Sequence, residues 1–341
     1  MKNGFKWKKI LLVTGSIIGC LLILYIVFFI VVLYRANVNP VRENWKSTGS
    51  FSSSFHPAGK IYLTLQSGKL FRGNLGIYEF DLNSKQNKEF LVGKYDNFTL
   101  DFSSDGVKKV FVSNSPGGDI DNLFVNEGEN SKSKQITFSS TTRKYYPLFS
   151  PDGNQIVFIL SAKAYLPFPD DKRVYITDMN GNERFIISGT NPLFSPNGED
   201  LLVLKNDGLY LVNINNKQSS RVIISPSGKV YPSMKLSLSK NYQMLAWSDA
   251  RNGEVTVFKI TNWKPFSYSI YKKIPIKAFG LTFSPDNRYL ALHEAKLNNR
   301  KNVPPSQSRL VIYDLETMEW QEVADLSDYN QTQMWITDWQ P

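Results

Sequence analysis

From about residue 50 onward, short apolar runs alternate with clusters of proline, glycine, asparagine and aspartate. Apolar runs of this length between turn residues are typical of β-strands, and no segment beyond residue 36 shows a convincing helical periodicity. The clearest stretch predicts four successive strands, at Tyr145–Ser150, Ile156–Leu160, Arg173–Asp178 and Arg184–Ser188. The pattern therefore predicts an all-β domain built from short strands.

The turn after the first of these strands carries a phrase, Phe-Ser-Pro-Asp-Gly, that recurs along the chain. Proline presets φ and glycine accepts a positive φ, so the phrase suits a tight turn. Its copies begin with a phenylalanine or leucine at 55, 102, 149, 194, 238 and 283, at intervals of 47, 47, 45, 44 and 45 residues. A period of this size is typical of propeller blades.

A second phrase recurs in fixed phase with the first and marks the third strand of each unit. Its copies are Ile77–Asp81, Val174–Asp178, Leu209–Asn213 and Leu310–Asp314. A four-stranded unit cannot bury both of its faces alone, so successive units must stack, and radial stacking gives a propeller. Six units predict a six-bladed β-propeller of four-stranded blades over residues 51–341.

The segment Trp335–Pro341 resembles a first strand that stops where its turn would begin, with Trp339 in the phenylalanine position. No further strands follow it. We expect it to supply the innermost strand of the first blade, which closes the ring and removes an exposed sheet edge.

Ahead of the repeats, residues 10–34 form a run of 25 residues without a charged side chain. As a helix this run would extend about 37 Å, enough to cross a hydrocarbon core of about 30 Å with some tilt. Four lysines precede the run, and only Arg35 follows it closely, which predicts a cytoplasmic N-terminus (residues 1–9) and a propeller outside the cell membrane. Residues 35–50 are polar and are predicted to form a tether.

Other interpretations of the apolar run lead elsewhere. A cleaved signal peptide has a shorter apolar region, of about 7–15 residues, and a small-residue exit. Cys20 follows a loose lipobox, but the residues after it stay apolar, so an unmodified cysteine is favoured. Gly15 and Gly19 have the small-xxx-small spacing of membrane helices that pack closely, which is the basis of a hypothetical helix-mediated dimer.

Charge and cysteine content narrow the partners. The net charge is +10, but five basic residues flank the apolar run, which leaves 35 basic against 30 acidic residues, or +5, for the remainder. So mild an excess predicts no nucleic-acid partner. The single cysteine excludes an intrachain disulfide, so the fold must rest on its core.

The repeated phrases resemble those of the TolB-like (WD40-like, PD40) β-propeller family over roughly residues 50–341. The resemblance rests on Phe149–Gly153, Val174–Asp178 and Ser248–Gly253, and it implies a six-bladed ring. A TolB protein has an α/β domain before its propeller, whereas this chain has the apolar run and the tether. The chain is similar to a membrane-anchored member of that family.

In such a ring the connections between second and third strands gather on one face and vary in length, which is typical of a binding face. Two of them, near residues 162–172 and 295–308, hold our candidate partner-binding residues. These are Lys163, Tyr165, Phe168, Lys172, Lys296, Arg300 and Lys301. They favour another envelope protein, a peptide or an anionic surface polymer as the partner. The alternative is that they are ordinary solvated loops.

Motifs for catalysis are scarce. His56 and His293 lie in different units, no cysteine–histidine spacing suggests a metal site, and no Gly-x-Ser-x-Gly elbow occurs. The repeated aspartates Asp105, Asp152 and Asp286 stand in equivalent turns, so we expect each to accept hydrogen bonds within its own turn. The sequence therefore predicts a binding or scaffolding module without a cofactor. The alternatives are a hydrolase or lyase with its site in the central channel, and a sensory ectodomain.

Overall fold

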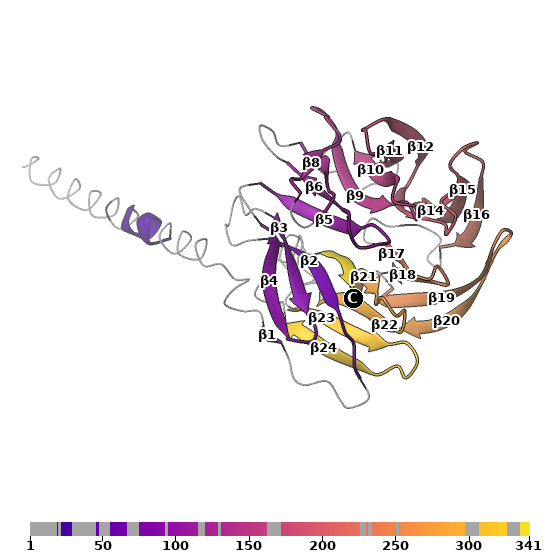
Figure 1. The fold of residues 1–341 in the computed structure, drawn as a ribbon. Coiled ribbons are helices and arrows are strands. Elements are labelled where there is room, and N and C mark those ends of the chain that lie inside the picture. Colours follow the sequence, from indigo (N-terminus) through magenta and orange to yellow (C-terminus); the bar gives the residue numbers. More distant parts are fainter. Residues whose placement is uncertain are drawn as a thin grey trace, which may run out of the picture.

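The structure, a computed structural model, is a six-bladed β-propeller of antiparallel four-stranded sheets (Figure 1). It describes residues 19, 22–28, 46–47, 55–66, 75–92, 95–114, 120–128, 131–161, 172–225, 230, 234–249, 252–296, 307–325 and 335–341. The predicted fold of the repeat region is confirmed.

Each blade lists its strands from the channel outward. Blade 1 has β25 (Trp335–Gln340), β2 (Lys60–Gln66), β3 (Leu75–Asp81) and β4 (Gln86–Leu91). Blade 2 has β5 (Asn97–Phe102), β6 (Lys109–Ser113), β7 (Asn122–Asn126) and β8 (Lys134–Gln135). Blade 3 has β9 (Arg143–Phe149), β10 (Gln155–Ser161), β11 (Lys172–Asp178) and β12 (Glu183–Ser188). Blade 4 has β13 (Thr190–Phe194), β14 (Asp200–Lys205), β15 (Gly208–Asn213) and β16 (Ser219–Ile224). Blade 5 has β17 (Lys235–Leu238), β18 (Met244–Asp249), β19 (Glu254–Trp263) and β20 (Phe266–Ile274). Blade 6 has β21 (Ala278–Phe283), β22 (Tyr289–Lys296), β23 (Gln307–Asp314) and β24 (Trp320–Asp325).

The repeated turn has one hydrogen-bond network in five blades. In blade 3 the Ser150 hydroxyl donates to Asp152 Oδ1 at 2.5 Å and accepts from the backbone N–H of Gln155 at 2.9 Å. Asp152 also accepts from the N–H of Asn154 at 3.1 Å. The same pattern begins at Ser103, Ser195, Ser239 and Ser284. The expectation that the turn aspartates serve their own turns is confirmed.

Six buried apolar clusters fill the six junctions between neighbouring blades. The cluster between blades 6 and 1 contains Phe55, Phe80, Tyr289, Ile312 and Trp339, all at most 2% exposed. Equivalent clusters join the other five pairs of blades. Since apolar burial is the main favourable contribution to folding, each blade is stabilised by both of its neighbours.

Strand β25 closes the ring, as the sequence predicted. It pairs antiparallel with β2, with Ile61 opposite Trp339 and Lys60 opposite Gln340. Trp339 is fully buried, and its indole N–H donates to the Ala58 carbonyl at 2.9 Å. Residues from the two ends of the repeat region therefore share one sheet.

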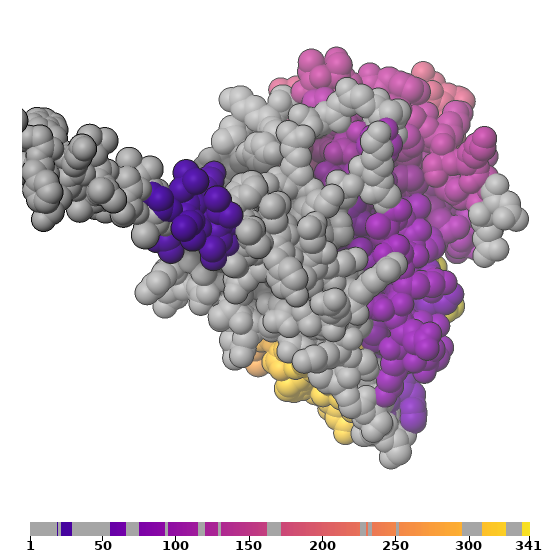
Figure 2. Space-filling view, turned by 90° about the vertical axis from the view of Figure 1, so that its left-hand side faces the viewer, coloured from indigo at the N-terminus to yellow at the C-terminus, as the bar shows by residue number. Residues whose placement is uncertain are grey.

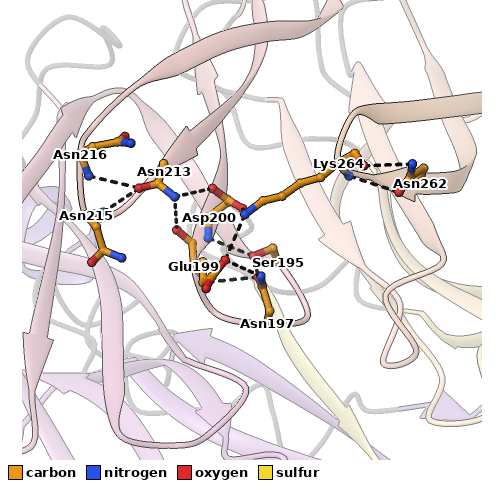
Figure 3. Close-up of polar contacts among 9 residues, drawn as sticks. All are labelled: Ser195, Asn197, Glu199, Asp200, Asn213, Asn215, Asn216, Asn262 and Lys264. Atoms are coloured by element: carbon orange, nitrogen blue, oxygen red, sulfur yellow. Dashed lines mark hydrogen bonds and ion pairs between the residues drawn. The ribbon is translucent and has the colours of Figure 1, made fainter.

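Polar contacts also join blades 4 and 5 (Figure 3). Lys264, in the hairpin between β19 and β20, lies 2.9 Å from Asp200 Oδ2 and 3.0 Å from Glu199 Oε2. Asn213 donates to Asp200 Oδ1 at 3.0 Å. These contacts hold the long β19–β20 hairpin against the turn of the preceding blade.

Little of the N-terminal region lies among the described residues. Residues 22–28 are helical, with side chains 46–66% exposed, and Figure 2 shows them as an indigo group apart from the purple surface of the first strands. Among the residues that the structure describes, no helix is both long and apolar enough to cross a membrane. Further along, β1 (Lys46–Ser47) pairs with β24 and adds a fifth strand to the outer edge of blade 6.

Candidate functional site

The inner strands of all six blades surround a central cavity with a volume of about 310 Å³. The residue that ends each inner strand in the repeat pattern, here called the anchor, is a phenylalanine, leucine or Trp339. The residues one and three positions before the anchor line the cavity in every blade. The first set, the acidic ring, comprises Asp101, Leu148, Leu193, Ser237, Thr282 and Asp338. The second set, the basic ring, comprises Thr99, Tyr146, Asn191, Lys235, Gly280 and Ile336.

The basic ring lies at an irregularity that recurs in the inner strands. The register between the first two strands shifts at this level in blades 1, 2, 3, 4 and 6. Thr99, Tyr146 and Asn191 have φ values of 48°, 50° and 49°, in the left-handed region. Such backbone is uncommon for these residue types, above all for a β-branched threonine, and it is often concentrated at functional sites.

Two lysines act on Tyr146 at the basic ring. Lys235 Nζ donates to Tyr146 Oη at 2.7 Å and lies 4.1 Å from the centre of the ring. Burial raises the pKa of Tyr146, but the charge and hydrogen bond of Lys235 and the charge of Lys172 together bring it below its usual value. Burial lowers the pKa of Lys172; Tyr146 raises it and Lys235 lowers it, and no carboxylate is among the groups that act on it. This end of the cavity therefore has a positive potential.

The acidic ring has two carboxylates on adjacent blades. Asp101 Oδ2 accepts from the backbone N–H of Phe149 at 2.7 Å. Burial and the charge of Asp338 raise the pKa of Asp101 to about 7, against an opposing effect of Lys240. Burial, the charge of Asp101 and the opposing charge of Lys240 also act on Tyr242, whose pKa is raised.

Lys240 reaches across the ring to this pair. It comes from the turn of blade 5, and its Nζ lies 3.0 Å from Asp338 Oδ1 on β25 of blade 1. Burial lowers the pKa of Lys240, but Asp338 and Asp101 raise it above its usual value. Ser104 and Pro151 also line the cavity here, so this end lies beside the repeated turns.

The sequence-predicted partner residues fall mostly elsewhere. Lys163, Tyr165, Phe168, Arg300 and Lys301 lie outside the described residues. Lys172 begins β11, and its charge acts on the basic ring. Lys296 ends β22, where it pairs with Gln307. Of the predicted set, the structure links Lys172 to the cavity.

The two histidines have separate positions. His293 is 2% exposed, and burial lowers its pKa to about 3, so it is neutral. His56 is exposed, and its backbone N–H donates to Tyr289 Oη at 3.2 Å. Among the described residues, no group of three or more histidine, cysteine, aspartate or glutamate side chains could hold a metal ion.

The sequence analysis missed both rings, although a signal was present. Within the repeat, the anchor is conspicuous because it recurs, whereas the residue three positions before it is different in every blade. Aligning the units on the anchor and reading the alternate positions upstream would have placed all twelve residues in the channel.

Comparisons with known proteins agree with the propeller fold. The chain matches TolB from Acinetobacter baumannii with 16% identity and a TM-score of 0.59, over 86% of this chain and 68% of that one. It matches a chain of the Nidogen/Laminin complex with 14% identity and a TM-score of 0.56, over 81% and 97%. It matches oligogalacturonate lyase from Vibrio parahaemolyticus with 14% identity and a TM-score of 0.54, over 83% and 85%. No family model and no curated protein sequence matches. At these identities the matches show a TolB-like β-propeller fold and nothing finer.

Proposed function

We propose that this chain is a binding module of the cell envelope, anchored by residues 10–34 with its propeller outside the membrane. The observation that carries the proposal is the central cavity, whose two rings hold opposite charges inside a rigid closed scaffold. Charged groups held in a concave, partly apolar site are typical of recognition sites. The partner is an envelope protein or a peptide that presents charged groups to the cavity.

The comparisons support an interaction role at the level of fold. One similar chain is TolB, and another comes from the Nidogen/Laminin complex, an assembly of two proteins. The anchor rests on the run of 25 uncharged residues. It is also supported by the exposed apolar side chains of residues 22–28.

Partner binding can be tested with the full-length protein in its own membrane. A photo-crosslinking residue at Ser104, which is exposed and lines the cavity, should capture a specific partner. The matched control is the same residue at Ser219, which is exposed on the outer strand β16. The partner, once identified and purified, should bind the wild type and lose affinity for Lys235→Gln. No adduct at Ser104, or the same adducts at both positions, would contradict the proposal.

The topology has its own test. Cys20 is the only cysteine, so Cys20→Ser with Ser219→Cys gives a chain with one reporter thiol. A membrane-impermeant maleimide should label this thiol in intact cells. Labelling only after lysis would place the propeller inside the cell and overturn that part of the proposal.

A second candidate function is a lyase or hydrolase acting in the cavity. It is favoured by Asp101, because a carboxyl whose pKa is raised to about 7 can act as a general acid or base near neutral pH. One similar structure is an oligogalacturonate lyase in complex with manganese. Manganese has no matching donor set among the described residues of this chain. Turnover of oligogalacturonate by the wild type but not by Asp101→Asn would establish this alternative.

A further inference from the structure

We propose that the central cavity binds a zwitterion the size of a dipeptide, with its carboxylate toward Lys235 and its ammonium toward Asp101. This inference rests on the proposed function, since it names the chemistry of the group that the binding module recognises. The argument has four parts: the charge at each end, the distance between the ends, the walls, and the competing lysine.

The basic ring is prepared for an anion. Lys235 and Lys172 both act on Tyr146, and the groups that act on Lys172 include no carboxylate. Two ammonium groups that repel each other in a half-buried position are stabilised when an anion is placed between them. The lowered pKa of the Tyr146 phenol reports the same potential, because it shows that negative charge is favoured at that oxygen. A ligand carboxylate near Lys235 would meet this potential.

The acidic ring is prepared for a cation. Asp101 is buried beside the charge of Asp338, and its raised pKa shows that negative charge is in excess at that carboxyl even with Lys240 nearby. A ligand ammonium at Asp101 would offset this excess and would donate a charge-assisted hydrogen bond. The ends of the cavity therefore attract opposite charges.

The distance between the rings selects the length of the ligand. The two rings are two residues apart along each inner strand, which corresponds to about 7 Å at the rise of a β-strand. An extended chain spans about 3.5 Å per residue, so a dipeptide matches this distance and a single amino acid falls short.

The walls provide for the rest of such a molecule. A cavity of about 310 Å³ is at the lower end of ligand-site volumes. Leu148 and Leu193 form an apolar wall at the acidic ring, which suits an aliphatic side chain. Thr99 is 6% exposed, and its hydroxyl has no hydrogen-bond partner within the part of the chain that the structure describes. That hydroxyl is available to the peptide group of the ligand.

Lys240 determines which carboxylate takes the ammonium. Asp338 already has Lys240 at 3.0 Å, the backbone N–H of Trp339 at 2.7 Å and the side-chain amide of Gln340 at 2.5 Å. Asp101 accepts from backbone N–H groups and makes no ion pair of that length in the described structure. Asp101 is therefore the principal partner of the ammonium, and Asp338 contributes through its charge.

The test uses three matched probes titrated by calorimetry into the full-length protein in detergent, at constant ionic strength. Glycyl-leucine carries both charges, N-acetylglycyl-leucine only the carboxylate, and glycyl-leucinamide only the ammonium. Glycyl-leucine should bind, and each blocked analogue should bind at least about tenfold more weakly, the loss expected for one charge-assisted hydrogen bond. Equal binding of the N-acetyl analogue would overturn the ammonium site, and absence of glycyl-leucine binding would overturn the whole inference.

Variants place the site within the cavity. Lys235→Gln and Asp101→Asn should each weaken glycyl-leucine binding at least about tenfold for the same reason. Lys259→Gln removes an exposed lysine of β19 in the same blade and should leave binding unchanged. Because the mutated cavity residues are polar and only partly buried, unfolding transitions measured alongside would separate lost binding from lost folding. Equal effects of Lys235→Gln and Lys259→Gln would refute the assignment.

A spectroscopic readout is independent of the calorimetry. A bound carboxylate should raise the pKa of Tyr146, because it disfavours the phenolate beside it. Alkaline titration of phenol absorbance, with Tyr146→Phe identifying the signal, measures this change. An unmoved titration at saturating glycyl-leucine would contradict the placement at Lys235. If the dipeptide binds but no crosslinked partner is found, the inference stands and only the protein partner of the proposed function fails.

Discussion

Trp339 should contribute more to the stability of the ring than any exposed tryptophan, because it fills the junction that joins the ends of the repeat region. It is fully buried among Phe55, Phe80 and Ile336, and its indole N–H donates to the Ala58 carbonyl. Trp339→Ala removes an entire buried side chain and is expected to cost about 3–5 kcal/mol. Since domains of this kind are stable by about 5–15 kcal/mol, that loss is a large part of the total.

Two matched variants divide this cost into its parts. Trp339→Phe keeps an aromatic ring in the junction but loses the hydrogen bond to Ala58, and it should cost less than the alanine variant. Trp320→Ala removes a tryptophan that is 45% exposed, stacks on Tyr313 and has Arg309 over its ring. Its cost should stay near about 1 kcal/mol, in the range of exposed cation–π contacts.

Urea unfolding of the full chain in detergent, followed by far-ultraviolet circular dichroism, measures all three variants. The expected order of destabilisation is Trp339→Ala, then Trp339→Phe, then Trp320→Ala. If Trp339→Ala costs no more than Trp320→Ala, the closing strand contributes nothing special, and the interpretation of β25 as the fastening of the ring is wrong.

Three further predictions concern pH, a buried charge and a turn. Because the pKa of Asp101 rises from its ordinary 3.8 to about 7 on folding, the folded state binds the extra proton, and stability should fall as pH rises from about 4 to 7. Asp101→Asn should remove that part of the fall between urea midpoints at pH 5 and pH 8, and identical pH profiles would contradict the assignment. Glu183→Gln should destabilise by up to about 3 kcal/mol, because it leaves the Lys144 ammonium, 1% exposed, without its partner at 3.6 Å. The double variant with Lys144→Met should recover most of that loss in a thermal melt, and no recovery would count against a charge effect. Gly181→Ala should destabilise more than Gly253→Ala, because a Cβ at 181 would lie 2.2 Å from the Ile136 carbonyl oxygen whereas no heavy atom lies within 4 Å at 253. The cost at 253 is backbone strain alone, about 1–2 kcal/mol, and equal melting temperatures of the two variants would refute the contact.

Much of the fold could be predicted because its signals are local. The strand predicted at Arg173–Asp178 is β11, Lys172–Asp178, and the turn at Pro151–Gly153 closes through bonds within six residues. Such turns write their chemistry into consecutive letters of the sequence. Ring closure was also predictable, since Trp339 stands in a recognisable but incomplete copy of the repeat.

The candidate site could not be predicted in the same way, because it is assembled across the ring. Lys235 meets Tyr146 from 89 residues away, and Lys240 meets Asp338 from 98 residues away. No local pattern connects such pairs, and residues that line one channel need not resemble one another. The sequence analysis looked instead to long loops, where residue types alone suggested contact, and the central cavity emerged only with the fold.

Strand β25 has a consequence beyond fastening the ring, since it also brings Asp338 into the cavity. A propeller with this strand detached lacks part of its recognition site, so competence to bind becomes a report on whether the ring is shut. By thermodynamic linkage, a ligand that binds only the shut form resists its opening by about 2.7 kcal/mol at a hundred times its Kd. In the membrane environment proposed for this chain, occupancy would therefore act as a latch, and an empty propeller would be the form most readily opened and degraded.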